Sequence, residues 1–212
     1  RLLLVQEDVA ERTIRMLKGA MAELSVGDPS ELATDIGPVI DREAKDALDA
    51  HIARMEAEAK LIARAPATPA MERGTFVAPV AFEIASLDML KKELFGPVLH
   101  VIRYKAERLD QVMDAINATG FGLTMGLHTR IDTTVEWLRR RSHAGNLYVN
   151  RNMIGAVVGV QPFGGEGLSG TGPKAGGPRY LPRFAAERVI SINTTAAGGN
   201  ASLMSVGDDL PG

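Results

Sequence analysis

The chain contains no cysteine among its 212 residues. This absence excludes disulfide bonds, thiolate-bound metals and a cysteine nucleophile within these residues. No apolar run approaches the ~20 residues that a membrane-spanning helix needs. The first residues lack the apolar core and small-residue cleavage site of a signal peptide. We therefore expect a cytoplasmic protein with no transmembrane segment.

An excess of charge of either sign is also lacking. The chain has 24 basic and 26 acidic residues, a net charge of -2, so we expect no binding of nucleic acid or of an anionic membrane by this segment. The four histidines are far apart and lack metal-ligand spacing, so each is better read as a surface or strand residue, and we expect no metal. The apolar share of 45% permits a normal core.

The chain opens on an apolar run, Arg1 to Val5, which is typical of a buried strand. A chain that begins inside a core strand is expected to be a piece of something longer. A processed chain is the alternative. The length suits one domain, or one large domain with a small extension.

Strand-like and helix-like periods alternate along the chain, which predicts an α/β fold. Asp8 is a plausible N-cap of the first helix. The expected strands are 2–5, 76–84, 98–104, 123–128, 147–150 and 184–193, and the expected helices are 8–23, 41–64, 109–117 and 132–141. Residues 155–177 show neither period and should form a long ordered loop; long loops without secondary structure of their own are usually functional or disordered. The tail is polar and glycine-rich, and we expect it to fray.

The segment from Lys92 to Val98 combines a carboxylate, an aromatic ring and a Gly-Pro pair just before a strand. The pair alone can be a simple turn. Glu93 and Phe95 could equally present an acceptor for a ribose and a flat apolar face for a nicotinamide ring. Spacing alone favours the turn.

The segment from Gly145 to Asn152 is a predicted strand that ends in polar residues. Sites in α/β proteins gather at the carboxyl ends of strands. The alternative is a strand followed by a solvated turn.

In the stretch from Gly155 to Gly172, many glycines are dispersed among apolar residues, so it is no flexible linker. Glycines let backbone N–H groups approach a ligand and form an anion-binding nest, which could hold a carboxylate. Phe163 could wall an aliphatic chain. The spacing of a phosphate-binding loop is absent.

Together and in this order, these segments resemble the aldehyde dehydrogenase superfamily, over nearly the whole chain up to about Thr195. The motif from Glu93 to Val98 is similar to the family's Glu-x-Phe-Gly-Pro-Val, and residues 117–123, 145–150 and 162–165 complete the order. Within the superfamily, Asn150 to Gly177 is most similar to L-glutamate γ-semialdehyde (1-pyrroline-5-carboxylate) dehydrogenases. The order of residues in this segment is closest to that in the C-terminal part of bacterial bifunctional proteins that also carry proline dehydrogenase.

The resemblance implies a catalytic domain with a mostly parallel sheet flanked by helices over 1–177, an oligomerisation strand within 178–195 and a flexible tail over 196–212. It implies NAD as cofactor, L-glutamate 5-semialdehyde as substrate, a homo-oligomer and a possible fusion to proline dehydrogenase. It places Glu93 on the nicotinamide ribose with Phe95 beside it, the backbone N–H groups of Gly155 and Ala156 on the substrate carboxylate, and Phe163 along its aliphatic part.

The resemblance also places the family's cysteine nucleophile just upstream of Arg1, with the nucleotide-binding half, so no catalytic residue is expected in this chain and we expect it to be inactive alone. A non-catalytic domain of the same superfamily, kept for a structural or oligomerisation role, is the main alternative. The intact Glu93 and glycine-rich loop weaken that alternative. A glycine-rich nucleotide-binding module is disfavoured by the missing phosphate-loop spacing.

Overall fold

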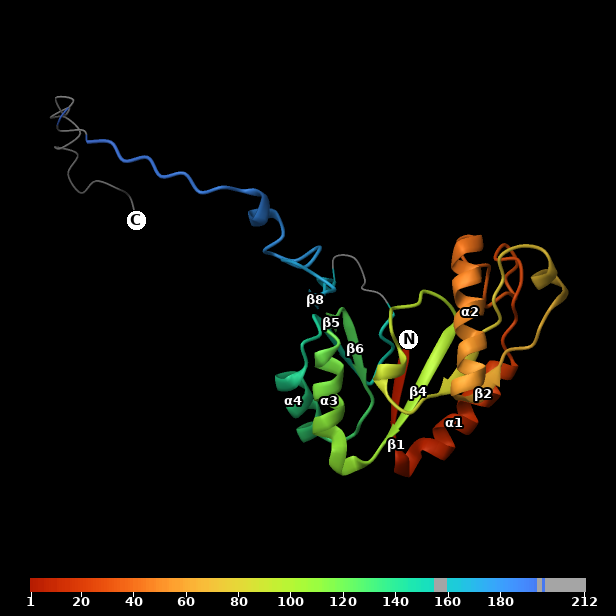
Figure 1. Ribbon diagram of the computed structural model, residues 1–212. Helices are drawn as coiled ribbons and strands as arrows, with labels where there is room; N and C mark the ends of the chain where they lie inside the picture. Colours follow the sequence, from red (N-terminus) through yellow and green to blue (C-terminus); the bar gives the residue numbers. More distant parts are fainter. Residues whose placement is uncertain (155–159, 194–195, 197–212) are drawn as a thin grey trace.

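The computed structural model describes residues 1–154, 160–193 and 196 (Figure 1). The strands are β1 (Leu2–Gln6), β2 (Lys60–Arg64), β3 (Val80–Glu83), β4 (Val98–Tyr104), β5 (Phe121–Gly122), β6 (Thr124–Leu127), β7 (Asn146–Val149) and β8 (Glu166–Gly167). The α-helices are α1 (Glu7–Ala22), α2 (Arg42–Glu58), α3 (Leu109–Ala118) and α4 (Asp132–Arg141). Short 3-10 helices cover Pro69–Glu72, Leu87–Met89, Ala106–Arg108 and Leu181–Phe184.

The main sheet has the order β1-β4-β3-β2. β4 runs parallel to both β1 and β3, while β2 pairs antiparallel at the edge. Successive side chains of a strand point to opposite faces, so the sheet feeds two cores. The core on the α2 face contains Leu48, Ile52, Met55, Val80, Phe82, Val98 and Ile102. The core on the α1 face contains Val5, Ala10, Ile14, Met21, Ile62, Ala81 and Val101.

A second group of elements follows β4. β6 and β7 form a parallel pair, and the short strands β5 and β8 form an antiparallel pair. Arg141 at the end of α4 makes ion pairs with Asp110 and Asp114 of α3, so the two helices lie side by side (Figure 1). Asn117 of α3 adds a hydrogen bond to the Arg141 carbonyl at 2.9 Å.

Several predicted elements are confirmed. β4 and α4 have the predicted bounds, and β1, α1, α3, β6 and β7 agree to within two residues at each end. The predicted N-cap Asp8 is wrong: Gln6 occupies that position, and Asp8 lies in the first turn, where its carboxylate favours the helix dipole. The Gln6 amide donates to Asp8 at 2.6 Å.

The single helix predicted over 41–64 is also wrong. α2 ends at Glu58, Ala59 is extended, and β2 follows at once. Pairing with β3 satisfies the backbone of β2, and Ile62 joins the core on the α1 face. Tertiary pairing has overridden the helical propensity of the alanine, lysine, leucine and arginine residues of this segment.

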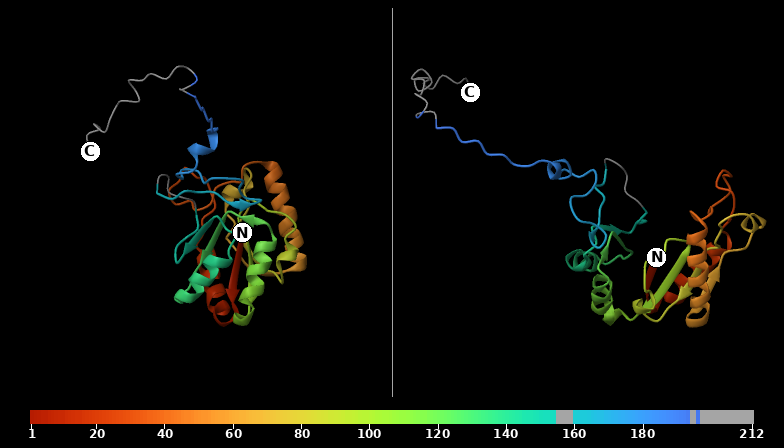
Figure 2. Two further views of the ribbon diagram at one scale, coloured as in Figure 1. Left: turned by 90° about the vertical axis from the view of Figure 1, so that its left-hand side faces the viewer. Right: turned by 45° about the horizontal axis from the view of Figure 1, so that its top comes forward.

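Residues 178–193 lead away from the body of the molecule (Figures 1 and 2). Beyond the 3-10 helix at Leu181–Phe184, residues 185–193 are exposed and form no strand within this single chain. A strand that pairs with another subunit needs that subunit, so the oligomerisation strand stays a prediction. The predicted tail, apart from Ala196, lies outside the described residues. Among the described helices, none is long and apolar enough to cross a membrane.

Candidate functional site

The loop before β4 carries Glu93 and Phe95 on its outer side. Both side chains are exposed, and the Phe95 ring is 71% accessible. The Arg1 guanidinium stands over that ring, 5.3 Å from its centre. An exposed carboxylate beside a flat exposed ring is the arrangement that the family resemblance implies for contact with a ribose and a nicotinamide.

The same loop is packed tightly against α2 on its inner side. A Cβ at Gly96 would lie 2.5 Å from the nearest methyl carbon of Leu48, a side chain that is 1% exposed. Pro97 accepts a hydrogen bond from the Val80 backbone N–H at 3.0 Å. The Gly-Pro pair is therefore a turn, and this turn also presents the two exposed side chains.

The glycine-rich loop after β7 is held by two polar side chains. Asn146 donates to the Pro162 carbonyl at 3.0 Å and accepts from the Gly164 N–H at 3.1 Å. Lys174 donates to the carbonyls of Gly145 and Gly164 at 2.5 and 2.7 Å. Phe163 pairs with Ala175 through two backbone hydrogen bonds. The loop is therefore ordered at residues 160–177, as predicted.

The glycines of this loop are needed chiefly for close packing of one backbone segment on another. A Cβ at Gly170 would lie 2.1 Å from the Gly165 carbonyl oxygen, and one at Gly145 would lie 2.1 Å from the Gly164 carbonyl oxygen. The N–H groups of Gly164 and Leu168 donate to Asn146 and to the Gly120 carbonyl. The predicted anion-binding nest depends on Gly155 and Ala156, which lie outside the described residues.

The predicted site residues fall into two groups in the structure. Glu93 and Phe95 share the loop before β4, and Phe163 lies half-buried in the loop after β7. Within the described ranges, no hydrogen bond, ion pair or ring contact joins the two loops. The two predicted groups of site residues are thus on separate loops of the described chain.

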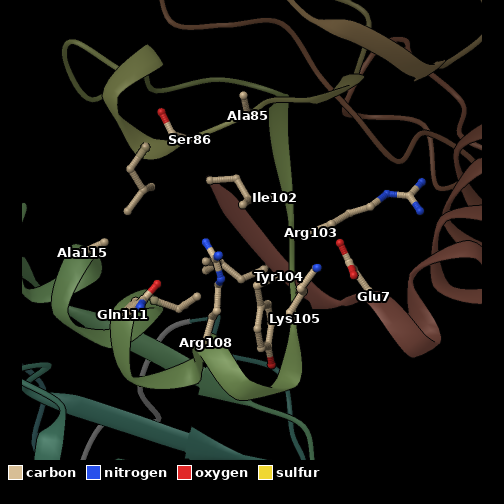
Figure 3. Close-up of a pocket in the computed structure, with 13 residues that line it drawn as sticks. Glu7, Ala85, Ser86, Ile102, Arg103, Tyr104, Lys105, Arg108, Gln111 and Ala115 are labelled. Carbon is tan, nitrogen blue, oxygen red and sulfur yellow. The ribbon is translucent and has the colours of Figure 1, made fainter.

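A cavity of about 380 Å³ opens between β4 and α3, away from both loops (Figure 3). Figure 3 shows Arg108 reaching from the start of α3 towards Ile102 on β4. No predicted site residue lines it. A smaller cavity of about 270 Å³ opens on the glycine-rich loop, at Gly164, Gly165 and residues 169–173. No predicted site residue lines this second cavity either. No group of three or more potential metal ligands occurs in the part of the chain that the structure describes.

A buried histidine pair was missed by sequence reasoning. The Nε2 atoms of His51 on α2 and His100 on β4 are 2.8 Å apart, with the side chains 8% and 3% exposed. The expectation that each is a separate surface or strand residue is wrong for His51, which is a buried helical residue. The pair is separated by 49 positions, so only the pairing of sheet and helix brings it together.

The hydrogen bonds around this pair fix its protonation. His100 Nδ1 lies 3.2 Å from the Arg1 carbonyl oxygen, which can only accept, so Nδ1 carries the proton. In a neutral ring His100 Nε2 is then the acceptor for the Nε2–H of His51. His51 Nδ1 is left as an acceptor and faces the Arg54 Nη2 at 3.5 Å. The same Arg54 atom donates to the Met89 carbonyl at 3.0 Å.

The electrostatic setting keeps both rings neutral. Burial, and after it the nearby His100 and Arg54, lower the pKa of His51 from 6.5 to about 4. Burial also lowers the pKa of His100, against the opposing effect of its hydrogen bond to Arg1. Near neutral pH the network therefore has one defined set of donors and acceptors.

Comparisons with known proteins show which family and which relatives this chain is similar to. Residues 1–190 match the aldehyde dehydrogenase family. The chain is 55% identical over 201 residues to the bifunctional protein PutA of Salmonella typhimurium, covering 92% of this chain and 15% of that protein. It is 38% identical over 182 residues to the 1-pyrroline-5-carboxylate dehydrogenase of Geobacillus kaustophilus, covering 84% and 34%.

Solved structures show the same likeness. A crystal structure of bifunctional proline utilization A (PutA) superposes with a TM-score of 0.87 at 61% identity, over 93% of this chain and 20% of that one. A 1-pyrroline-5-carboxylate dehydrogenase from Thermus with bound NAD superposes with a TM-score of 0.77 at 37% identity, over 86% and 35%. The chain thus spans well under half the length of each of these relatives, and its predicted α/β fold of this type is confirmed.

Proposed function

This chain belongs to the aldehyde dehydrogenase family, and from that premise we propose that it forms the C-terminal part of an NAD-dependent enzyme of proline degradation. The enzyme would oxidise L-glutamate γ-semialdehyde to L-glutamate. The cyclic form of this aldehyde is 1-pyrroline-5-carboxylate, which opens by adding water.

One observation carries the proposal. The same residues match both the bifunctional PutA proteins and the separate 1-pyrroline-5-carboxylate dehydrogenases. A segment shared by a bifunctional protein and a single-activity protein is expected to serve the activity that the two have in common. That reasoning favours the oxidation of the aldehyde over an activity found in only one of the two groups.

The loop before β4 suits NAD. The exposed Glu93 carboxylate can accept hydrogen bonds from ribose hydroxyls, and the exposed Phe95 ring offers a flat apolar face beside the nicotinamide. NAD, when bound, accepts the hydride that leaves the aldehyde carbon. Gly96 and Pro97 fix the loop from behind, so both side chains keep their outward positions.

The glycine-rich loop suits the substrate. Phe163 is anchored by two backbone hydrogen bonds to Ala175 and can pack along the aliphatic part of the substrate. Gly155 and Ala156 would offer backbone N–H groups to the α-carboxylate. Recognition through backbone donors requires no cationic side chain at that position.

The bond-making nucleophile is not among these residues. The chain contains no cysteine, and the family resemblance implies a cysteine that attacks the aldehyde. We therefore expect these 212 residues alone to show no NAD reduction with L-glutamate γ-semialdehyde. Turnover above the blank by the isolated chain would refute this part of the proposal.

The C-terminal segment suits self-association. Val189, Ile190 and Ile192 are 90%, 67% and 74% exposed in the single chain. Exposed apolar side chains of this density mark interaction surfaces. We propose that this segment pairs with a second copy of the chain. A fusion to proline dehydrogenase is part of the same proposal.

Two variants test the assignment of the two loops in the natural protein that carries this chain. Glu93→Gln should raise the KM for NAD about tenfold, the effect of losing ~1.4 kcal/mol of binding, with the KM for the aldehyde little changed. Phe163→Ala should raise the KM for the aldehyde and leave the KM for NAD little changed. Steady-state kinetics with each substrate varied in turn would measure both. Equal losses for both substrates in either variant would contradict the division of roles.

The competing candidate is a non-catalytic domain of the same family. It predicts no NADH formation from L-glutamate γ-semialdehyde by the natural protein under any condition. Formation of NADH that is faster with this aldehyde than with propanal, which lacks the carboxylate, would exclude that candidate and support the proposed substrate.

A further inference from the structure

A chain of four groups joins α2 to the residue just before β1. It consists of Arg54, His51, His100 and the carbonyl of Arg1, which we call the histidine chain. Its central link is the 2.8 Å contact between the two Nε2 atoms, and its ends reach Met89 on one side and Arg1 on the other. Both imidazoles are buried on the α2 face of the sheet. Water therefore does not replace these hydrogen bonds.

The two ends of the histidine chain contact the segment that carries Glu93 and Phe95. Arg54 donates to the Met89 carbonyl, a few residues before Glu93. Arg1 stands over the Phe95 ring at 5.3 Å. Between these ends, Gly96 packs on Leu48, one turn before His51 on α2. The outward-facing loop is thus held from behind along one face of α2.

The hydrogen bonds exist only while both rings are neutral. A proton on His100 Nε2 would place two N–H groups against each other, and a proton on His51 Nδ1 would face the Arg54 guanidinium. The charged side chains around the pair are Arg54 and Glu58 of α2 and Lys92 of the loop; Glu58 alone favours the protonated form of His51. Protonation of His100 therefore breaks the central link, and protonation of His51 breaks its contact with Arg54.

We propose that His51 and His100 are positioning residues for the cofactor-contacting loop, which they hold through Arg1 and Met89 as long as both rings are neutral. The proposal rests on the proposed function, because it assigns a ligand to the loop. It also has a purely structural consequence. The backbone of residues 91–97 should be protected from hydrogen exchange by contacts that depend on the two imidazoles.

The test compares three variants of the natural protein with the wild type. His51→Leu removes the central link. His51→Gln retains an amide N–H at the place of Nε2–H and does not titrate. His128→Gln is the control, because His128 is exposed just after β6, away from the histidine chain. Two quantities are measured: hydrogen–deuterium exchange of residues 91–97, and the Kd for NAD by titration calorimetry, each from about pH 8 to about pH 5.

His51→Leu should raise the exchange of residues 91–97 and weaken NAD binding about tenfold at neutral pH. His51→Gln should restore both values and should lose the part of the acid sensitivity that comes from protonation of His51. His128→Gln should behave as the wild type. Unchanged exchange in His51→Leu, or a failure of the Gln variant to restore it, would overturn the proposal.

The two readouts separate this proposal from the proposed function. If the wild type binds no NAD while His51→Leu still raises exchange, the proposed function fails and the assignment of the loop to a cofactor is overturned with it. If His51→Leu does not fold, His100→Asn decides, because its amide can still donate to Arg1 but cannot reach His51. Normal exchange of residues 91–97 in that variant would overturn the proposal.

Discussion

The two loops proposed to bind ligands are held in different ways. The loop at residues 91–97 is held by packing on α2 and by the histidine chain, so side chains fix it. The loop at residues 160–177 is held by Lys174 and Asn146 bonding to carbonyls and an N–H group, and by glycines that touch other backbone atoms. The first should tolerate compensating substitutions, whereas the second should not.

The largest expected effect comes from adding a methyl group where only backbone can give way. Gly170→Ala should destabilise the protein by about 3 kcal/mol, because its Cβ would lie 2.1 Å from the Gly165 carbonyl oxygen. Gly96→Ala meets the Leu48 side chain instead, so it should cost less in a Leu48→Ala background than alone. Thermal unfolding of the wild type, Gly96→Ala, Leu48→Ala and the double variant measures this difference. Gly19→Ala, with open space around it on α1, is the control and should be neutral or stabilising. A Gly170→Ala protein as stable as this control would contradict the comparison.

The second effect is a loss of stability in acid that originates at His51 of α2, in the histidine chain behind the first loop. The unfolded chain protonates His51 with a pKa of 6.5, and the folded chain does so only near 4. Between these values the unfolded state binds more protons, so the free energy of unfolding falls as pH falls, by up to about 3 kcal/mol. His51→Gln should flatten this part of the profile in urea unfolding experiments. An unchanged slope in that variant would show that other groups cause the acid loss.

The third effect should be confined to the second loop. Lys174→Met keeps the aliphatic stem but leaves the carbonyls of Gly145 and Gly164 without their donor, which should cost about 2 kcal/mol. Exchange should rise in residues 160–177 and stay unchanged in residues 91–97. A rise in both loops would mean that they are coupled, and the contrast between them would be lost.

Regular elements could be predicted where one period dominates. The largely apolar run at Val98–Tyr104 and the helical pattern at Asp132–Arg141 predicted both elements with the observed bounds. The helix over 41–64 was extended too far because β2 exists only through its pairing with β3. Short edge strands of this kind carry little periodic signal of their own.

In the candidate site too, some residues could be predicted from local sequence and others only from the tertiary structure. Glu93, Phe95 and Phe163 could be proposed from motifs, because each lies within a run of characteristic residues. The histidine pair could not, since spacing along the chain says nothing about two side chains 49 positions apart. One weak signal existed: His100 sits at an inward position of an otherwise apolar strand, where a polar group needs a partner.

The sequence by itself determined the family, the alternation of strands and helices, and the composition that removes cysteine chemistry from these residues. Those properties are written in local patterns and in residue identity. Only the tertiary structure decided that glycines of the second loop touch backbone carbonyls, that Gly96 rests on Leu48, and that two distant histidines are hydrogen-bonded to each other. The physical reason is that packing and hydrogen bonding between distant segments depend on the arrangement of the sheet and its helices, which no local pattern specifies.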